Sequence, residues 1–156
     1  MNVKEKLFEK LEQKEADMIK HRRYLHQHPE LSFQENATAE YIKDFYKDKD
    51  VVVTQPVAES NAIIVEIKGQ HPGNTIGLRA DFDALPINEE ADVPFKSTNE
   101  GVMHACGHDA HTAYLLGLAD ALIDIKDELP GTIKIIHQHA EEMPQVVHSK
   151  LWHRVR

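Results

Sequence analysis

Residues 104–142, HACGHDAHTAYLLGLADALIDIKDELPGTIKIIHQHAEE, predict a helix followed by a strand, with chemically reactive side chains at both ends. Apolar residues recur at helical spacing from Ala110 to about Asp127, and the apolar run 132–137 is typical of a strand. Residues 104–111, at the start of the helix, hold three histidines, the only cysteine and an aspartate, and Glu141-Glu142 follow the strand. Asp109 is predicted to be the N-cap of this helix, since its carboxylate can accept from free N–H groups of the first turn.

Two further helices are predicted near the N-terminus. Residues 3–20 carry one apolar stripe among charges. We expect this first helix to end just before His28, because Pro29 disfavours helical geometry in the residue that precedes it. Ser32 followed by Glu35 has the pattern of a capping box that opens a second amphipathic helix.

Three apolar runs between these helices and the final pair predict strands, at 51–54, 62–68 and 75–80. A turn is predicted at Pro72-Gly73-Asn74, and residues 87–103 are predicted to form a loop. The alternation of helices and strands predicts an α/β domain with helices layered around a mixed, largely parallel sheet.

Acidic residues follow two of the predicted strands directly. Asp81 and Asp83 come after the third strand, and Glu141 and Glu142 come after the fourth. In open α/β sheets, ligand sites gather at the carboxyl ends of the strands. We therefore expect these acidic residues and the Cys/His cluster to share one site.

The composition excludes several classes of protein. A chain of 156 residues favours one domain, and a net charge of −8 disfavours a nucleic-acid partner. The N-terminus lacks the apolar core of a signal peptide, and no apolar run approaches the length of a membrane span. A single cysteine excludes an internal disulfide and favours a cytoplasmic location.

The Cys/His cluster has the ligand types that zinc and neighbouring transition metals prefer. Cys106 and His108 are separated by Gly107, which lets the backbone turn tightly. Glu141 or Glu142 could add a carboxylate, provided that the chain turns there. The alternative is a set of surface histidines near a helix start, with Cys106 as a small buried apolar side chain and the glutamates in a solvated loop.

Four motifs together resemble the aminoacylase and hippurate hydrolase branch of metallopeptidase family twenty. They occur in the family's order: HRRYLHQHPELSFQE (21–35), GLRADFDALPI (77–87), HACGHDAHTA (104–113) and HQHAEE (137–142). The resemblance implies a zinc-peptidase-like catalytic domain, here incomplete. It also implies a metal-dependent amidohydrolase that cleaves the amide bond of N-acyl amino acids or small peptides.

The resemblance also implies the roles of individual residues. Cys106 would bridge two divalent ions (zinc, manganese, cobalt or nickel), while His108 and Glu142 would each bind metal. Glu141 would be the general base and acid, and Asp83 would support a metal-bound ligand, with Asp81 beside it. Three further histidines are predicted to orient ligands or to be structural: His26, His104 and His111. Family members are often homo-oligomers that act on small molecules, without a membrane or nucleic-acid partner.

The sequence departs from the family after Pro144. Family members are longer, with further metal-binding histidines and a second, smaller domain. Residues 145–156 hold three basic and no acidic residues and do not resemble the family, so we divide the chain into 1–144 and a tail. The family's Pro-Pro-Gly-Gly-Ala could be encoded CCA CCA GGT GGT GCA C, and loss of one C gives Pro-Gln-Val-Val-His, as at Pro144–His148. The sequence therefore predicts a frameshifted, truncated product.

This departure predicts weak metal binding and little or no hydrolase activity for the chain alone. Two other functions stay open at this point. A non-catalytic metal- or partner-binding module could use His148 and His153 to complete its site. A hydrolase could instead use Cys106 as its nucleophile, although the two acidic clusters would then have no evident task.

Overall fold

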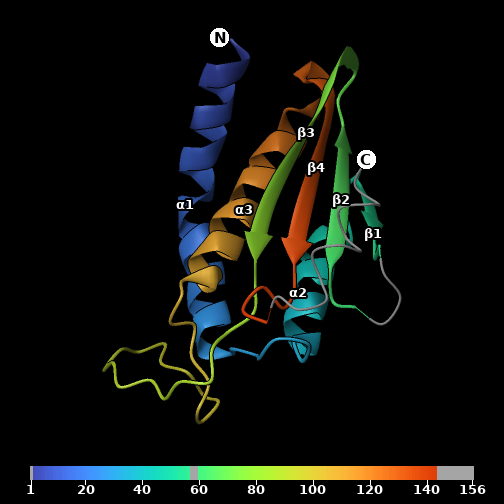
Figure 1. The fold of residues 1–156 in the computed structure, drawn as a ribbon. Coiled ribbons are helices and arrows are strands. Elements are labelled where there is room, and N and C mark those ends of the chain that lie inside the picture. The colour runs from blue at the N-terminus through green and yellow to red at the C-terminus, as the bar shows by residue number, and fades with distance from the viewer. Residues whose placement is uncertain (1, 57–59, 144–156) are drawn as a thin grey trace.

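A computed structural model describes residues 2–56 and 60–143 and alternates helices with strands (Figure 1). Its helices are α1 (Val3–Gln27), α2 (Asn36–Tyr46), α3 (His108–Asp124) and the short 3₁₀ helix η1 (Lys126–Glu128). Its strands are β1 (Val52–Thr54), β2 (Ile63–Lys68), β3 (His71–Asp81) and β4 (Pro130–Gln138). The predicted α/β class is confirmed, since the four strands form one mixed sheet.

The sheet has the order β1-β2-β4-β3 and is less parallel than the sequence predicts. Only β3 and β4 are parallel neighbours, with α3 as the connection between them. β2 is antiparallel to both β1 and β4. The link between β2 and β3 spans only Gly69 and Gln70 and reverses the chain, so these two strands run in opposite directions on either side of β4.

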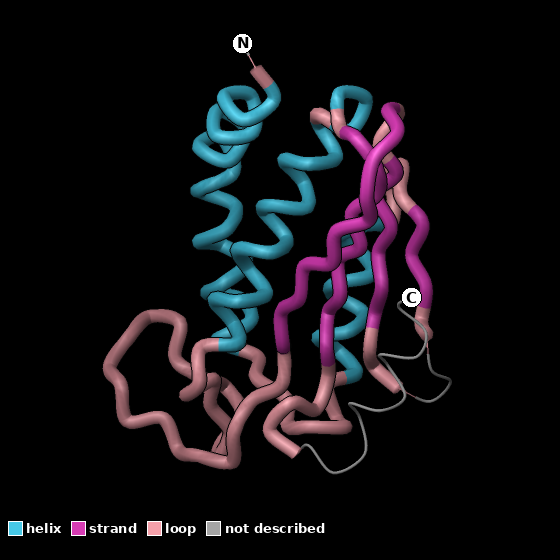
Figure 2. Tube along the Cα trace, turned by 45° about the horizontal axis from the view of Figure 1, so that its top comes forward, coloured by secondary structure: helices cyan, strands magenta, loops and turns pink. Residues whose placement is uncertain are grey.

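The main hydrophobic core lies between one face of the sheet and helices α2 and α3. Ile63, Val65 and Ile67 alternate along β2 and are fully buried against this layer, as the period of two in a strand requires. Ile135 of β4 and Leu116 of α3 are also fully buried in this core. Helix α1 packs on the outer side of α3, away from the sheet (Figure 2).

Truncation of a core side chain provides a direct test of this packing. Ile135 is 0% exposed, so Ile135→Ala should lower the free energy of unfolding by about 2–5 kcal/mol. Ile76 on β3 is 56% exposed, so Ile76→Ala should change the free energy of unfolding by less than about 0.5 kcal/mol. Urea unfolding of the two variants measures both values. Equal losses would contradict the placement of β4 in the core.

The first helix ends where the sequence predicts, but the second begins differently. α1 stops at Gln27, and His28 has left helical geometry with φ −123°. The predicted capping box is wrong, because Glu35 makes no side-chain bond to the start of α2. The carboxylate of Glu30 instead accepts hydrogen bonds from the free amides of α2 at Ala37 (3.2 Å) and Thr38 (2.7 Å).

Two other local predictions are also wrong. α3 begins at His108 with Gly107 as its N-cap, so Asp109 lies inside the first turn. Gly107 has a φ of +93°, which glycine adopts readily because it has no Cβ. The predicted turn at Pro72-Gly73-Asn74 is part of β3, where the register with β4 shifts between His71 and Thr75.

The predicted tail at 145–156, its proposed frameshift origin and His148 and His153 all lie outside the described residues. Among the described helices, none combines the length and the apolar character needed to cross a membrane.

Candidate metal centre

Three chain segments meet at the carboxyl ends of β3 and β4. Asp81 pairs with Gln138 at the end of these parallel strands, so the segments that follow leave the sheet side by side. One of them carries Asp83 and the other carries Glu141-Glu142. Helix α3 starts at this same end of the sheet (Figure 1), which adds Cys106 and His108.

His108 is held with one ring nitrogen facing the acidic pair. Its Nδ1 donates to the backbone carbonyl of Asp83 at 2.9 Å and lies 3.2 Å from the Asp83 carboxylate. Its Nε2 lies 3.8 Å from Oε2 of Glu141 and 3.9 Å from Oε1 of Glu142. Burial opposes the charged form, but the hydrogen bonds to Asp83 and the nearby carboxylates outweigh it and raise the pKa of His108 to about 9.

Asp83 is buried, and its contacts join all three segments. Its Oδ2 accepts hydrogen bonds from the Ser32 hydroxyl at 2.7 Å and from the Glu142 amide at 2.9 Å. Burial acts to raise the pKa of this carboxyl, but the bonds from His108, Glu142 and Ser32 outweigh burial and lower it to about 2. Asp83 therefore stays ionised and fixes both the ring of His108 and the backbone at Glu142.

Cys106, His108 and Glu142 offer one ligand atom each, and these three atoms lie within 4.8 Å of one another. A thiolate, an imidazole and a carboxylate suit zinc and neighbouring transition metals. Oε1 of Glu142 is buried and makes no hydrogen bond to any described residue. Since a buried acceptor without a partner is costly, this atom fits the position of a cation ligand.

The thiol of Cys106 is exposed and is not activated as a nucleophile. Desolvation raises its pKa, and a hydrogen bond to Glu142 together with the charges of Glu142 and Glu141 raises it further. A nucleophilic cysteine needs the opposite shift, toward thiolate at neutral pH. The direction of this pKa shift disfavours the thiol hydrolase that the sequence left open.

Glu141 differs from Glu142 in its surroundings. Its side chain is 36% exposed, against 23% for Glu142, and it is not one of the three clustered ligands. It still reaches within 3.8 Å of Nε2 of His108. Glu141 is therefore the more exposed of the two glutamates, while Glu142 belongs to the ligand cluster.

A second set of candidate ligands, Asp81, His108 and His111, also lies within 4.8 Å. The guanidinium of Arg79 forms an ion pair with Asp81, which partly neutralises its carboxylate. His111 is exposed and stacks on His108 with ring centroids 5.8 Å apart. This set is less suited to a cation than the Cys106 set, because a cation there would compete with Arg79.

Two further histidines of the motifs, His26 and His104, are buried. His26 is buried, and its nitrogens lie 2.7 Å from Asp109 and 2.9 Å from Glu89, which ties α1 to α3 and to the loop after β3. His104 is 5% exposed, and burial lowers its pKa to about 4. Asp109 also receives a hydrogen bond from Arg22 at 3.0 Å, so its carboxylate serves this buried network instead of a helix cap.

Sequence reasoning missed two residues that support the site, Ser32 and Glu35. Their spacing matches the capping box and predicts a helix cap for both. Ser32 binds Asp83, whereas Glu35 accepts a hydrogen bond from the amide of Ala140 at 2.8 Å. The spacing alone could not separate these roles, since the true partners are far away in the sequence.

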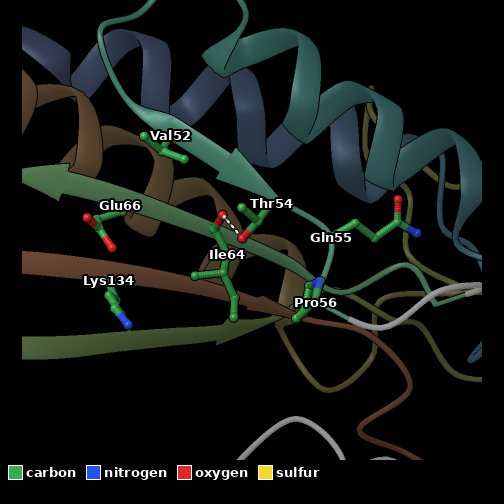
Figure 3. A pocket seen from close by; sticks show the side chains of 7 residues that line it. All are labelled: Val52, Thr54, Gln55, Pro56, Ile64, Glu66 and Lys134. Atoms are coloured by element: carbon green, nitrogen blue, oxygen red, sulfur yellow. Dashed lines mark hydrogen bonds between the residues drawn. The ribbon is translucent and has the colours of Figure 1, made fainter. Parts of the chain in front are cut away.

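A separate hollow lies beside β1 on the other face of the sheet (Figure 3). Thr54 closes part of it by donating a hydrogen bond to the carbonyl of Ile64 at 3.4 Å. It contains none of the predicted site residues, and the facing pair Glu66 and Lys134 gives it no ligand cluster. Its lining residues are Val52, Thr54, Gln55, Pro56, Ile64, Glu66 and Lys134.

Comparison with known proteins finds similar chains. Residues 77–150 match the model of peptidase family M20/M25/M40. An N-acyl-L-amino acid amidohydrolase of Geobacillus stearothermophilus is 43% identical over 142 residues, which cover 90% of this chain and 38% of that protein. The chain therefore spans well under half the length of this relative.

Two crystal structures share the fold closely. One, from methicillin-resistant Staphylococcus aureus and described as a proposed aminohydrolase, is 52% identical with a TM-score of 0.91, covering 97% of this chain and 40% of that one. The other is a dinuclear metal-binding peptidase of the M20 family from Bacillus subtilis, 44% identical with a TM-score of 0.78, covering 82% and 36%. Both the matched residues and these relatives relate the chain to peptidase family M20/M25/M40.

Proposed function

We propose that this chain supplies metal ligands and the proton carrier of a metal-dependent amidohydrolase that acts on N-acyl amino acids or small peptides. The observation that carries the proposal is the convergence of Cys106, His108 and Glu142 within 4.8 Å from two separate segments. Asp83 supports it, because its backbone carbonyl accepts from Nδ1 of His108 and so orients Nε2 toward Glu142. The substrate class rests on the amidohydrolase relative.

The division of labour follows from the positions of the side chains. When bound, divalent ions would lower the pKa of a water molecule and polarise the amide carbonyl of the substrate. Cys106, His108 and Glu142 would hold the metal, and Asp83 would orient His108. Glu141 would accept a proton from the attacking water and return it to the leaving amine, which is the work of a general base and acid.

We also propose that the 156-residue chain alone has little activity. The better-suited set of described ligands, Cys106, His108 and Glu142, suffices for one ion but not for two. The second set shares His108 with the first, and its Asp81 is paired with Arg79. The frameshift at Pro144 remains a prediction, and sequencing of the gene tests it. The DNA after the Pro144 codon should encode a Gly-Gly-rich continuation in another reading frame. A cytoplasmic setting belongs to the same proposal, since a ligating thiol must stay reduced.

An assay of hydrolysis tests the proposal. A version of the chain restored to the length of its relatives should release the amino acid from N-acetyl amino acids or hippurate when manganese or zinc is added. Chelation should abolish this release, and the 156-residue chain should be slower by at least about 100-fold, which is the range of a lost positioning contribution. Metal uptake without hydrolysis by the restored version would favour a non-catalytic binding module instead.

A further inference from the structure

The motif at 21–35 contains a buried acid that the proposed chemistry does not use. Glu35 is 0% exposed, although glutamate is rarely fully buried unless its carboxylate has partners. Burial raises the pKa of this carboxyl despite several hydrogen bonds to it. Keeping such a group in the interior is costly, so its partners indicate what it does there.

The partners of Glu35 lie far from it in the sequence. Oε1 accepts a hydrogen bond from the amide of Ala140 at 2.8 Å, and Oε2 accepts one from the side chain of Asn61 at 3.2 Å. The bond to Ala140 spans 105 residues and is buried. Glu35 therefore fixes the backbone immediately before Glu141 and Glu142.

Ala140 needs such a partner because its conformation is unusual. It has a φ of +50° and is fully buried, and left-handed geometry is unfavourable for any residue with a Cβ. This residue turns the chain after β4, so that both glutamates reach His108. Two carboxylates hold the turn, with Glu35 on the amide of Ala140 and Asp83 on the amide of Glu142.

We propose that Glu35 is a positioning residue for the metal centre, which sets the turn at Ala140 and thereby the place of Glu142 as a ligand. The inference rests on the proposed function, because it takes Glu142 to be a metal ligand. It gives the motif at 21–35 a specific task that acts through the backbone, without contact to metal or substrate.

Cobalt(II) binding by the 156-residue chain tests the proposal, with absorbance and calorimetry as readouts that do not depend on activity. Glu35→Ala should weaken cobalt binding by about 10- to 100-fold, the usual cost of losing a group that orients a ligand. Glu35→Gln should stay close to the wild type, because its amide oxygen can still accept from Ala140. Glu30→Ala is the matched control: this nearby glutamate caps α2 and does not touch the turn, so cobalt affinity should be retained.

A double-mutant cycle separates positioning from general loosening of the structure. If Glu35 acts through Glu142, Glu35→Ala should weaken cobalt binding no further in a chain that already carries Glu142→Ala. Additive losses would overturn the proposal. If Glu35→Ala fails to fold by circular dichroism, Glu35→Asp decides, since it keeps the acid but is too short to reach Ala140. It should bind cobalt as weakly as expected for Glu35→Ala, and wild-type affinity for Glu35→Asp would overturn the proposal.

The outcomes also distinguish this inference from the proposed function. If the wild-type chain binds cobalt and Glu35→Ala binds it equally well, only the positioning role is wrong. If the wild-type chain binds no cobalt, the metal site itself is wrong, and the role of Glu35 is overturned with it.

Discussion

Replacing Glu141 with glutamine in the version restored to family length should lower kcat by about 100- to 10,000-fold, the range expected for loss of a general base and acid. Glutamine keeps the size of the side chain but cannot take a proton. Metal content should be unchanged, because Glu141 lies outside the three clustered ligands. The rate of release of the amino acid and the metal content of the purified variant measure the two effects.

Glu142→Gln is the matched control for this prediction, since it makes the same chemical change one residue away. Glu142 contributes its buried Oε1 to the ligand cluster, so this variant should lose metal affinity. Excess metal should then restore part of its activity, whereas the Glu141→Gln variant should not respond. If excess metal rescues Glu141→Gln, the roles of the two glutamates are reversed.

Much of the local structure could be predicted because it depends on neighbouring residues. Pro29 acts on His28 directly, and the end of α1 follows from that contact. The apolar runs of β2 and β4 have no period that could be mistaken for a long helix, and both are strands. Strand direction could not be predicted in the same way, because a buried apolar run has the same composition in a parallel or an antiparallel pairing.

The candidate site could be assembled in part for a similar reason. Acidic residues directly after strands predict a shared edge, and the parallel pairing of β3 with β4 brings Asp83 and Glu142 into contact. The supporting residues could not be predicted, since Ser32 and Glu35 match a local capping pattern while their partners are 51 and 105 residues away. Nothing in the residue type of Ala140 indicates a positive φ, so the turn at this residue could not be predicted from the sequence either.

Acidification should destabilise the metal-free chain through His137, a residue that lies outside the ligand cluster. Burial lowers the pKa of this fully buried imidazole from about 6.5 to about 3. Its Nε2 lies 3.0 Å from the Tyr46 hydroxyl, and its Nδ1 has no hydrogen-bond partner among the described residues. A proton added in the folded state would therefore create a buried imidazolium that no carboxylate of the described structure stabilises by direct contact.

The sign of the effect follows from the two pKa values. Below about pH 6.5 the unfolded chain takes up a proton at His137 while the folded chain does not, so the free energy of unfolding falls as the pH falls toward about 3. The slope is about 1.4 kcal/mol per pH unit, which gives a loss of about 2 kcal/mol between pH 6.5 and pH 5.

Urea unfolding of the wild type and of His137→Gln across this pH range measures the loss. His71→Gln, on the exposed end of β3, is the control for loss of a histidine. Of the two variants, only His137→Gln should flatten the acid slope, and part of the slope should remain because burial also lowers the pKa of His104, to about 4. Parallel curves for all three proteins would mean that His137 is protonated, or reached by water, in the folded chain, and the packing of Tyr46 against β4 would then be wrong.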